Sequence, residues 1–160
     1  TSLVPIVVMS TLLGLFVPLS AQQTERVTES SQAIRAAVAA AGAWLDMIDG
    51  GRYETARDSA GEELRDVVTG PAWERRISSV RQGIGPLDER SVGTTEATDS
   101  LPGGDEGDYV VVTFDSSFGV LTEAVETVIV SRQDDGAWRP IGYFVRPAEE
   151  APGRTVHRRR

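Results

Sequence analysis

The sequence contains no cysteine and no lysine, and its only histidine is His157, near the C-terminal end. Without cysteine there can be no disulfide, thiolate metal ligand or cysteine nucleophile. Without lysine, Schiff-base and P-loop chemistry are excluded. A body without histidine cannot form a Ser-His-Asp triad or a typical zinc site, so any general acid or base must be Asp, Glu or Tyr. We therefore expect no cofactor and no metal.

Positive charge is also scarce. The chain carries 16 arginines against 24 acidic residues, a formal charge of -8. Four of these arginines lie between positions 154 and 160, so residues 1–150 have a formal charge of about -12. Such a surface repels phosphate backbones, and we expect no nucleic-acid partner.

Long apolar runs are absent except for one, residues 3–19 (LVPIVVMSTLLGLFVPL), followed by the small residues Ser20 and Ala21. This pattern predicts a signal peptide over residues 1–21 and a periplasmic or secreted protein, because export without disulfides is typical of bacteria. The alternative is an uncleaved N-terminal membrane anchor, the only case in which we expect membrane contact. We predict a linker at 22–31, a single domain at 32–146 and a disordered tail at 147–160.

The first half of the domain has helical periodicity. Val38, Ala41, Leu45 and Ile48 repeat at three and four residues, and Gly50 follows as a helix stop. The same reasoning predicts a second helix over 53–68 and a third over 71–82, the latter burying Trp73, Ile77 and Val80.

After residue 86 the period changes to two, which predicts strands at 87–98, 109–114, 124–132 and 137–146. Pro140 lacks a backbone donor, so the last strand should be an edge strand or be bulged there. The predicted fold class is α+β, with three N-terminal helices packed on a curled antiparallel sheet of about four strands.

Several segments occur in an order that resembles a known family: AWLDMIDGGRYETARDSAG (43–61), LPGG and YVVVTFDSSF (101–118), and DGAWRPIGYFVR (135–146). Together they resemble the bacterial family called domain of unknown function 4019, over about residues 35–146. The resemblance implies export in Gram-negative bacteria and a cone-shaped fold like that of nuclear transport factor 2. It implies no activity and transfers no catalytic residue.

Asp49 and Tyr53 are the first candidate site residues. Asp49 falls in the last turn of the first predicted helix, where a negative charge meets the negative end of the helix dipole. The structural interpretation is that Asp49 accepts hydrogen bonds from the N–H groups that open the next helix, or pairs with Arg52. The functional interpretation is a carboxylate base that faces Tyr53 across a cone-shaped cavity.

Glu126 and Tyr143 complete the candidate pocket. Glu126 shares a strand face with Val128 and Val130, so it should point toward the helices and pair with Arg57 or Arg139, or become an acid in an apolar pocket. The large aromatic residues are expected in the core, and they could also line a cavity for an apolar ligand: Trp44, Trp73, Trp138, Tyr143 and Phe144.

These observations favour a non-enzymatic exported module that binds a partner protein or a small apolar ligand. Two alternatives stay open: a small cofactor-free isomerase or hydrolase that uses Asp or Glu with Tyr, and a membrane-tethered structural protein of the envelope.

Overall fold

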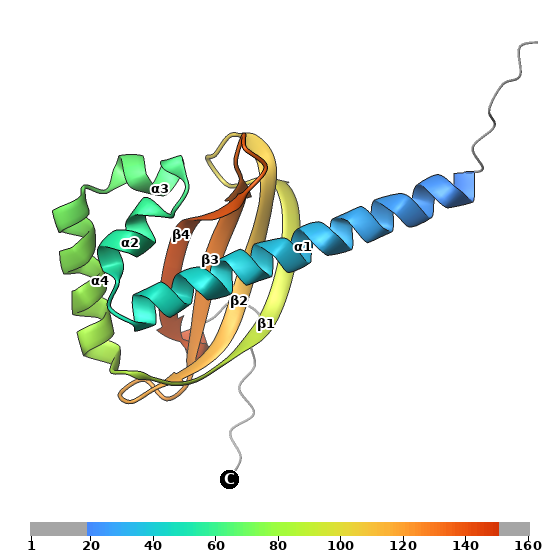
Figure 1. Ribbon diagram of the computed structural model, residues 1–160. Coiled ribbons are helices and arrows are strands. Elements are labelled where there is room, and N and C mark those ends of the chain that lie inside the picture. The colour runs from blue at the N-terminus through green and yellow to red at the C-terminus, as the bar shows by residue number, and fades with distance from the viewer. Residues whose placement is uncertain (1–18, 151–160) are drawn as a thin grey trace, which may run out of the picture.

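The computed structural model describes residues 19–150, with side chains from residue 28 onward (Figure 1). A four-stranded antiparallel sheet in the order β1-β2-β3-β4 follows a set of helices, which confirms the predicted α+β class and the four strands. The elements are α1 (Leu19–Asp49), α2 (Tyr53–Asp58), α3 (Glu62–Val67), α4 (Gly70–Ile84), β1 (Leu87–Ser100), β2 (Glu106–Phe118), β3 (Ala124–Arg132), β4 (Trp138–Pro147) and a short 3-10 helix (Ala148–Glu150).

Helix α1 crosses one face of the sheet and projects beyond β1 (Figure 1). Among its residues with described side chains, those in the core lie in the C-terminal half: Ala37, Ala41, Trp44, Leu45 and Ile48. Residues 22–31, predicted to be a linker, are helical. The segment between residues 19 and 41 has no glycine or proline, so a helix nucleated by the packed half can extend through these polar residues.

The predicted second helix is in fact two short helices, α2 and α3, separated at residues 59–61. Gly61 explains the break, because its N–H donates to the carbonyl oxygen of Pro140 at 2.8 Å. A Cβ on Gly61 would lie 2.6 Å from Cγ2 of Ile141, so only glycine allows this approach of the turn to β4. Arg57 then caps α3 by donating to the carbonyl oxygens of Arg65 and Val68.

Helix α4 agrees with the third predicted helix and carries Pro71 in its first turn. Trp73 and Ile77 are buried as predicted, but the next buried residue is Arg81 rather than Val80. Buried positions on α4 thus follow one another at four-residue intervals, and the last of them is a charge.

The inner face of the sheet, which we define by Val112, Phe114, Val128 and Val130, packs against the helices to form the core. Three aromatic rings fill its centre. Trp44 lies 5.8 Å from Trp73 and 5.6 Å from Tyr143, measured between ring centroids. The indole N–H groups of the two tryptophans donate to the carbonyl oxygens of Ala56 and Tyr53, respectively, and fix α2 against the core.

The last strand, β4, is an edge strand with a register irregularity opposite Ile129 and Val130, which confirms the prediction made from Pro140. Pro147 ends this strand, and the N–H of the buried Ala148 donates to the carbonyl oxygen of Glu123. Ordered structure therefore continues past the predicted start of the tail. The predicted signal segment up to residue 18 and the rest of the tail from residue 151 lie outside the described residues. Within residues 19–150, none of the helices combines the length and apolar composition that crossing a bilayer requires.

Candidate functional site

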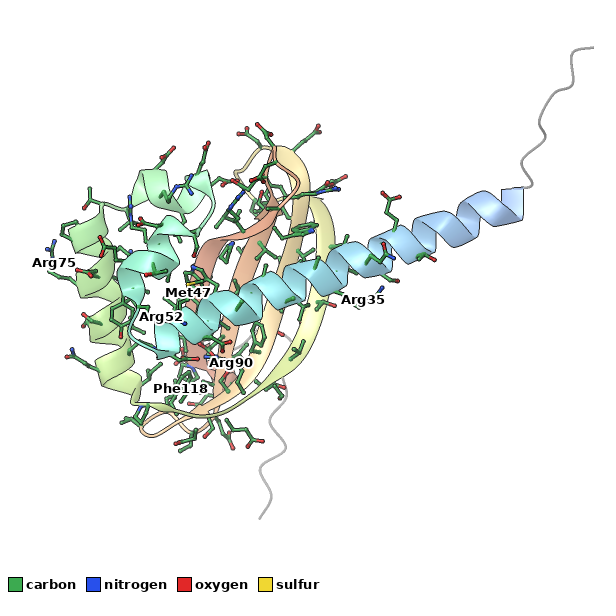
Figure 2. The ribbon with its side chains drawn as sticks, viewed as in Figure 1. Arg35, Met47, Arg52, Arg75, Arg90 and Phe118 are labelled. Atoms are coloured by element: carbon green, nitrogen blue, oxygen red, sulfur yellow. The ribbon has the colours of Figure 1, made fainter. Side chains whose placement is uncertain are left out.

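A cluster of buried charges lies where the C-terminal end of α1 meets the inner face of the sheet. Figure 2 shows Arg90 near this end of α1, with Phe118 close by. Six residues from six different elements form the cluster, and we call them the ion cluster: Asp49, Arg81, Arg90, Ser116, Glu126 and Tyr143.

Glu126 is at the centre of the ion cluster and is 0% exposed. Its Oε1 accepts a hydrogen bond from the Tyr143 hydroxyl at 2.6 Å and lies 3.5 Å from a guanidinium nitrogen of Arg81. Its Oε2 accepts from Nε of Arg90 at 2.6 Å and from Oγ of Ser116 at 2.7 Å. Three hydrogen-bond donors and one ion-pair partner therefore surround the Glu126 carboxylate.

The expected partners of Glu126 were wrong. Arg57 instead caps α3, and Arg139 pairs with Asp135 across the hairpin turn at 2.5 Å. Arg57 and Arg139 form contacts close to them in sequence. The observed partners of Glu126 are Arg81 and Arg90, which belong to elements distant from it in sequence.

Asp49 joins the same two arginines at the edge of the ion cluster, and its side chain is 19% exposed. Its Oδ2 accepts from Arg90 at 2.6 Å, and its Oδ1 accepts from Arg90 at 3.2 Å and also contacts Arg81. The two predicted structural roles of Asp49 are therefore wrong: Arg52 occupies the N-cap of α2 without a side-chain cap, and Asp49 turns toward α4 and β1. With two arginines and two carboxylates, the ion cluster has no formal net charge.

The hydroxyl group of Tyr143 donates a hydrogen bond to Oε1 of Glu126. Burial raises the pKa of this hydroxyl well above its ordinary value, and the negative charge of Glu126 raises it further. Tyr53, the fourth candidate residue, makes no hydrogen bond with the ion cluster within the described residues. It is partly buried against the core, and its carbonyl oxygen accepts from Trp73.

Sequence reasoning missed Arg81, Arg90 and Ser116. The sequence held one signal for Arg81, because this residue lies four positions after Ile77 on the buried side of α4. In the structure its guanidinium group lies 4.9 Å from the centroid of the Phe118 ring. Arg90 had no such signal, since nearly all of β1 is polar and exposed. Only the β1–β2 register places it beside Ser116.

The hydrogen bonds and ion pairs of the ion cluster described above are all between its own members. Glu126 accepts three hydrogen bonds from the cluster, one of them from the Tyr143 hydroxyl, and three aromatic rings pack beside them. In the part of the chain that the structure describes, no three Asp, Glu or His side chains are placed to hold a metal ion.

A second feature is a groove of about 610 Å³ between the projecting half of α1 and the ends of the strands, which we call the α1 groove. Its apolar and aromatic lining comes from Ala33, Ile34, Ala97, Tyr109, Val110 and Trp138. Its polar lining comes from Glu29, Ser30, Thr98, Asp99, Asp108 and Arg132. None of the four candidate pocket residues lines this groove; of the aromatic residues considered for a ligand cavity, Trp138 does.

Comparisons with known proteins give one family. The family model described as "Protein of unknown function (DUF4019)" matches residues 40–143. No curated protein matches the chain. Among solved structures, a chain from Catenulispora acidiphila determined at 2.5 Å has a TM-score of 0.47 and 12% sequence identity, and the alignment covers 81% of this chain and 96% of that one. A likeness at this level does not establish the cone-shaped fold.

Proposed function

This chain belongs to the DUF4019 family, and because the family description assigns no function, we propose one from the structure. The chain is a non-enzymatic binding module whose α1 groove receives a small apolar ligand that carries a positively charged group. The observation that carries this proposal is the pairing of an apolar groove with an acidic rim.

The size and the walls of the α1 groove suit a small molecule. Its volume of about 610 Å³ lies within the range of roughly 300 to 1,000 Å³ typical of ligand sites. Ala33 and Ile34 on α1 face Val110 on the sheet, so apolar ligand surface would leave water on both sides. Tyr109 and Trp138 add aromatic surface, which attracts cations to its face.

The charged residues that line the α1 groove favour a ligand with a positive charge. Three acids line it, Glu29, Asp99 and Asp108, against the single arginine Arg132. Arg132 lies 3.8 Å from Asp108 and offsets that one carboxylate, which leaves Glu29 and Asp99 uncompensated by an ion pair within the described residues. Since residues 1–150 as a whole are acidic, an anionic ligand would meet repulsion at long range as well.

The state of the ion cluster supports binding over catalysis. An isomerase or hydrolase needs a carboxylate within reach of a substrate, whereas both oxygens of Glu126 and both oxygens of Asp49 are engaged by arginines. No observation favours the enzyme alternative.

Export is also part of the proposal. The uncharged apolar run at residues 3–19 and the lack of cysteine support a module that works in the periplasm or outside the cell. The crossing of α1 over the inner face supports a cone-like arrangement of the kind expected from the family resemblance. Intact-mass analysis of the exported protein tests the first point: removal of residues 1–21 supports it, whereas retention in the membrane fraction at full mass favours the anchor.

Calorimetric titration with two matched probes tests the binding function. Hexyltrimethylammonium and hexyl sulfate share an alkyl chain and differ in the sign of the head group. We expect the cation to bind at least about tenfold more tightly, a difference of roughly 1.4 kcal/mol. Ala33→Trp should block the groove and abolish binding, while Ala39→Trp, on an exposed side of the same helix, should leave it intact. Equal affinity for both probes, or binding that survives Ala33→Trp, would refute the proposal.

A further inference from the structure

The two edges of the sheet differ in how well they are protected. At the β4 edge, Pro140 and Pro147 lack backbone donors, and the carbonyl oxygen of Pro140 accepts a hydrogen bond from Gly61 in the turn before α3. At the β1 edge, no further strand pairs within residues 19–150. Strand β1 has 14 residues and no proline, and residues 91–97 are all exposed. The unpaired backbone groups of an edge strand can pair with another strand, so β1 is the open edge of this sheet.

A bulge divides β1 into two regular halves of equal length. Residues 89–92 pair in register with β2, residues 95–98 do so again, and Gly93 and Thr94 between them face Thr113 alone. Such a bulge bends and twists the strand, which is one way in which proteins prevent a straight strand from adding to an edge. A second β1 carries the same bulge at the same place, so it can follow this edge where a straight peptide cannot.

We propose that the β1 edge binds a second copy of this chain, β1 against antiparallel β1, so that the two four-stranded sheets become continuous. A two-fold axis through the bulge, perpendicular to the sheet, places residues 89–92 of each copy opposite residues 95–98 of the other. Bulge then faces bulge, and both regular halves of each strand gain a partner. The inference stands whether or not the α1 groove binds a ligand.

The inner face of β1 lacks the cover that such a partner would give. Val92 lies opposite Phe114, on the same face as the core, yet Val92 is 51% exposed. In the proposed register, Val92 of each copy lies opposite Thr95 of the other, and both residues are exposed in the single chain. Helix α1 continues past β1 on this side of the sheet (Figure 1), so it extends over the position of the added strand. Pairing would therefore remove apolar surface of Val92 from water.

The charged residues in the regular halves of β1 allow this register. Glu96 of one copy lies opposite Ser91 of the other, and Glu89 lies opposite Thr98. Arg90 lies opposite an uncharged residue and can keep its place in the ion cluster. No two like charges are therefore directly opposed within the paired halves.

Some repulsion between acids remains, and it predicts how the dimer responds to salt. Glu89 of one copy and Glu96 of the other are diagonal neighbours, and Asp88 and Asp99 lie opposite one another just beyond the paired halves. Salt screens repulsion between exposed charges. The dimer should therefore become tighter as the salt concentration rises.

Analytical ultracentrifugation of the full chain over a range of concentrations tests the interface. We expect a reversible monomer–dimer equilibrium. Ser91→Glu sets a carboxylate directly opposite Glu96 at two places and should raise the dissociation constant at least about threefold, whereas Ser91→Arg should lower it. The matched controls are Ser79→Glu and Ser79→Arg, which make the same changes at an exposed position of α4 and should leave the equilibrium unchanged. A protein that stays monomeric up to about 1 mM, a dimer that salt weakens, or a dimer indifferent to both Ser91 substitutions would overturn the inference.

Engineered cysteines test the register, because the chain has no cysteine of its own. Ser91→Cys in one sample and Glu96→Cys in another place thiols on directly opposite residues, whose Cα atoms should lie roughly 4.5 to 5.5 Å apart, within reach of a disulfide. The two variants, mixed and oxidised, should form a mixed disulfide dimer. Neither variant should cross-link to itself, since the two copies of residue 91 would lie about 16 Å apart along the strands. Self-cross-linking of either variant, or no mixed dimer at concentrations where the protein is dimeric, would show that the proposed arrangement is wrong.

Discussion

Glu126 is the buried centre of the ion cluster and contacts residues of α4, β1, β2 and β4. Its carboxylate is fully buried and balances part of the charge of Arg81 and Arg90. Buried charges are tolerated when they are paired and hydrogen-bonded, and removal of one partner leaves the other in a poor solvent. The ion cluster thus ties α1, α4 and all four strands together, at the cost of sensitivity to any single change.

Glu126→Gln should lower the free energy of unfolding by about 3 to 5 kcal/mol, because both arginines lose a buried counter-charge. Glu123→Gln, an exposed substitution three residues earlier, should change it by no more than about 0.5 kcal/mol. Urea denaturation measures both. If Glu126→Gln lowers the free energy of unfolding by less than about 1 kcal/mol, the ion cluster contributes little to the stability of the fold.

Tyr143 should make the folded protein less stable at alkaline pH. Because burial and Glu126 raise the pKa of its hydroxyl in the folded state, the unfolded chain loses this proton at a lower pH than the folded one. The stabilising contribution is therefore complete below about pH 10, the pKa of an unfolded tyrosine, and declines as the pH rises further. Tyr143→Phe should make the loss of stability above pH 10 shallower, as thermal melts between pH 8 and pH 11 would show. An unchanged slope would mean that Tyr143 ionises freely in the folded protein.

The candidate residues were only partly predictable. Asp49, Glu126 and Tyr143 were named from local patterns, and the structure brings them into one cluster. No contact in the structure tests a pocket formed by these residues, and the proposed function assigns ligand binding to the α1 groove instead. Tyr53 lies elsewhere. The arginines could not be assigned, because the pairing of Arg90 with Asp49 spans 41 residues and depends on the β1–β2 register, which a polar strand does not reveal.

Among the elements, strands were easier to predict than helix boundaries. Apolar residues at alternate positions indicated β2 and β3, which have one face in the core, whereas β1 is nearly all polar and exposed and gave a weaker pattern. The extension of α1 to Leu19 was missed because polarity, taken alone, resembles a linker. The break at residues 59–61 was missed because it depends on a tertiary contact of Gly61 with β4 that has no local signature.

Gly61→Ala should destabilise the protein by about 1 to 3 kcal/mol, because the added methyl group would meet Ile141 and force α3 away from β4. Gly70→Ala is the matched control: a Cβ there meets nothing within 4 Å, and the expected change is within about 0.5 kcal/mol. Equilibrium unfolding in urea compares the two variants. Equal stabilities would show that the turn at Gly61 is loosely held.

At the scale of the whole molecule, the α1 groove and the ion cluster are two separate features. They share no residue, since the groove is lined by the projecting half of α1 and the strand ends, whereas the cluster lies at the C-terminal end of α1. Ligand binding and the stability that the cluster gives should therefore be independent.

Two variants separate these features. Ala33→Trp should abolish binding of hexyltrimethylammonium and leave the free energy of unfolding nearly unchanged, because residue 33 lines only the groove. Glu126→Gln should do the reverse. Calorimetric titration and urea denaturation of both proteins make the comparison, and a variant that changes both properties would show that the two features are coupled.

The groove's role as the binding surface is tested most directly by chemical-shift mapping of the ¹⁵N-labelled protein during titration with hexyltrimethylammonium. We expect the shifts to concentrate at the Trp138 indole and at the amides of Ala33, Ala97 and Val110, which line the α1 groove. The amides of Asp49 and Glu126 should barely move. Shifts centred on the ion cluster, with the groove unaffected, would contradict the proposed function.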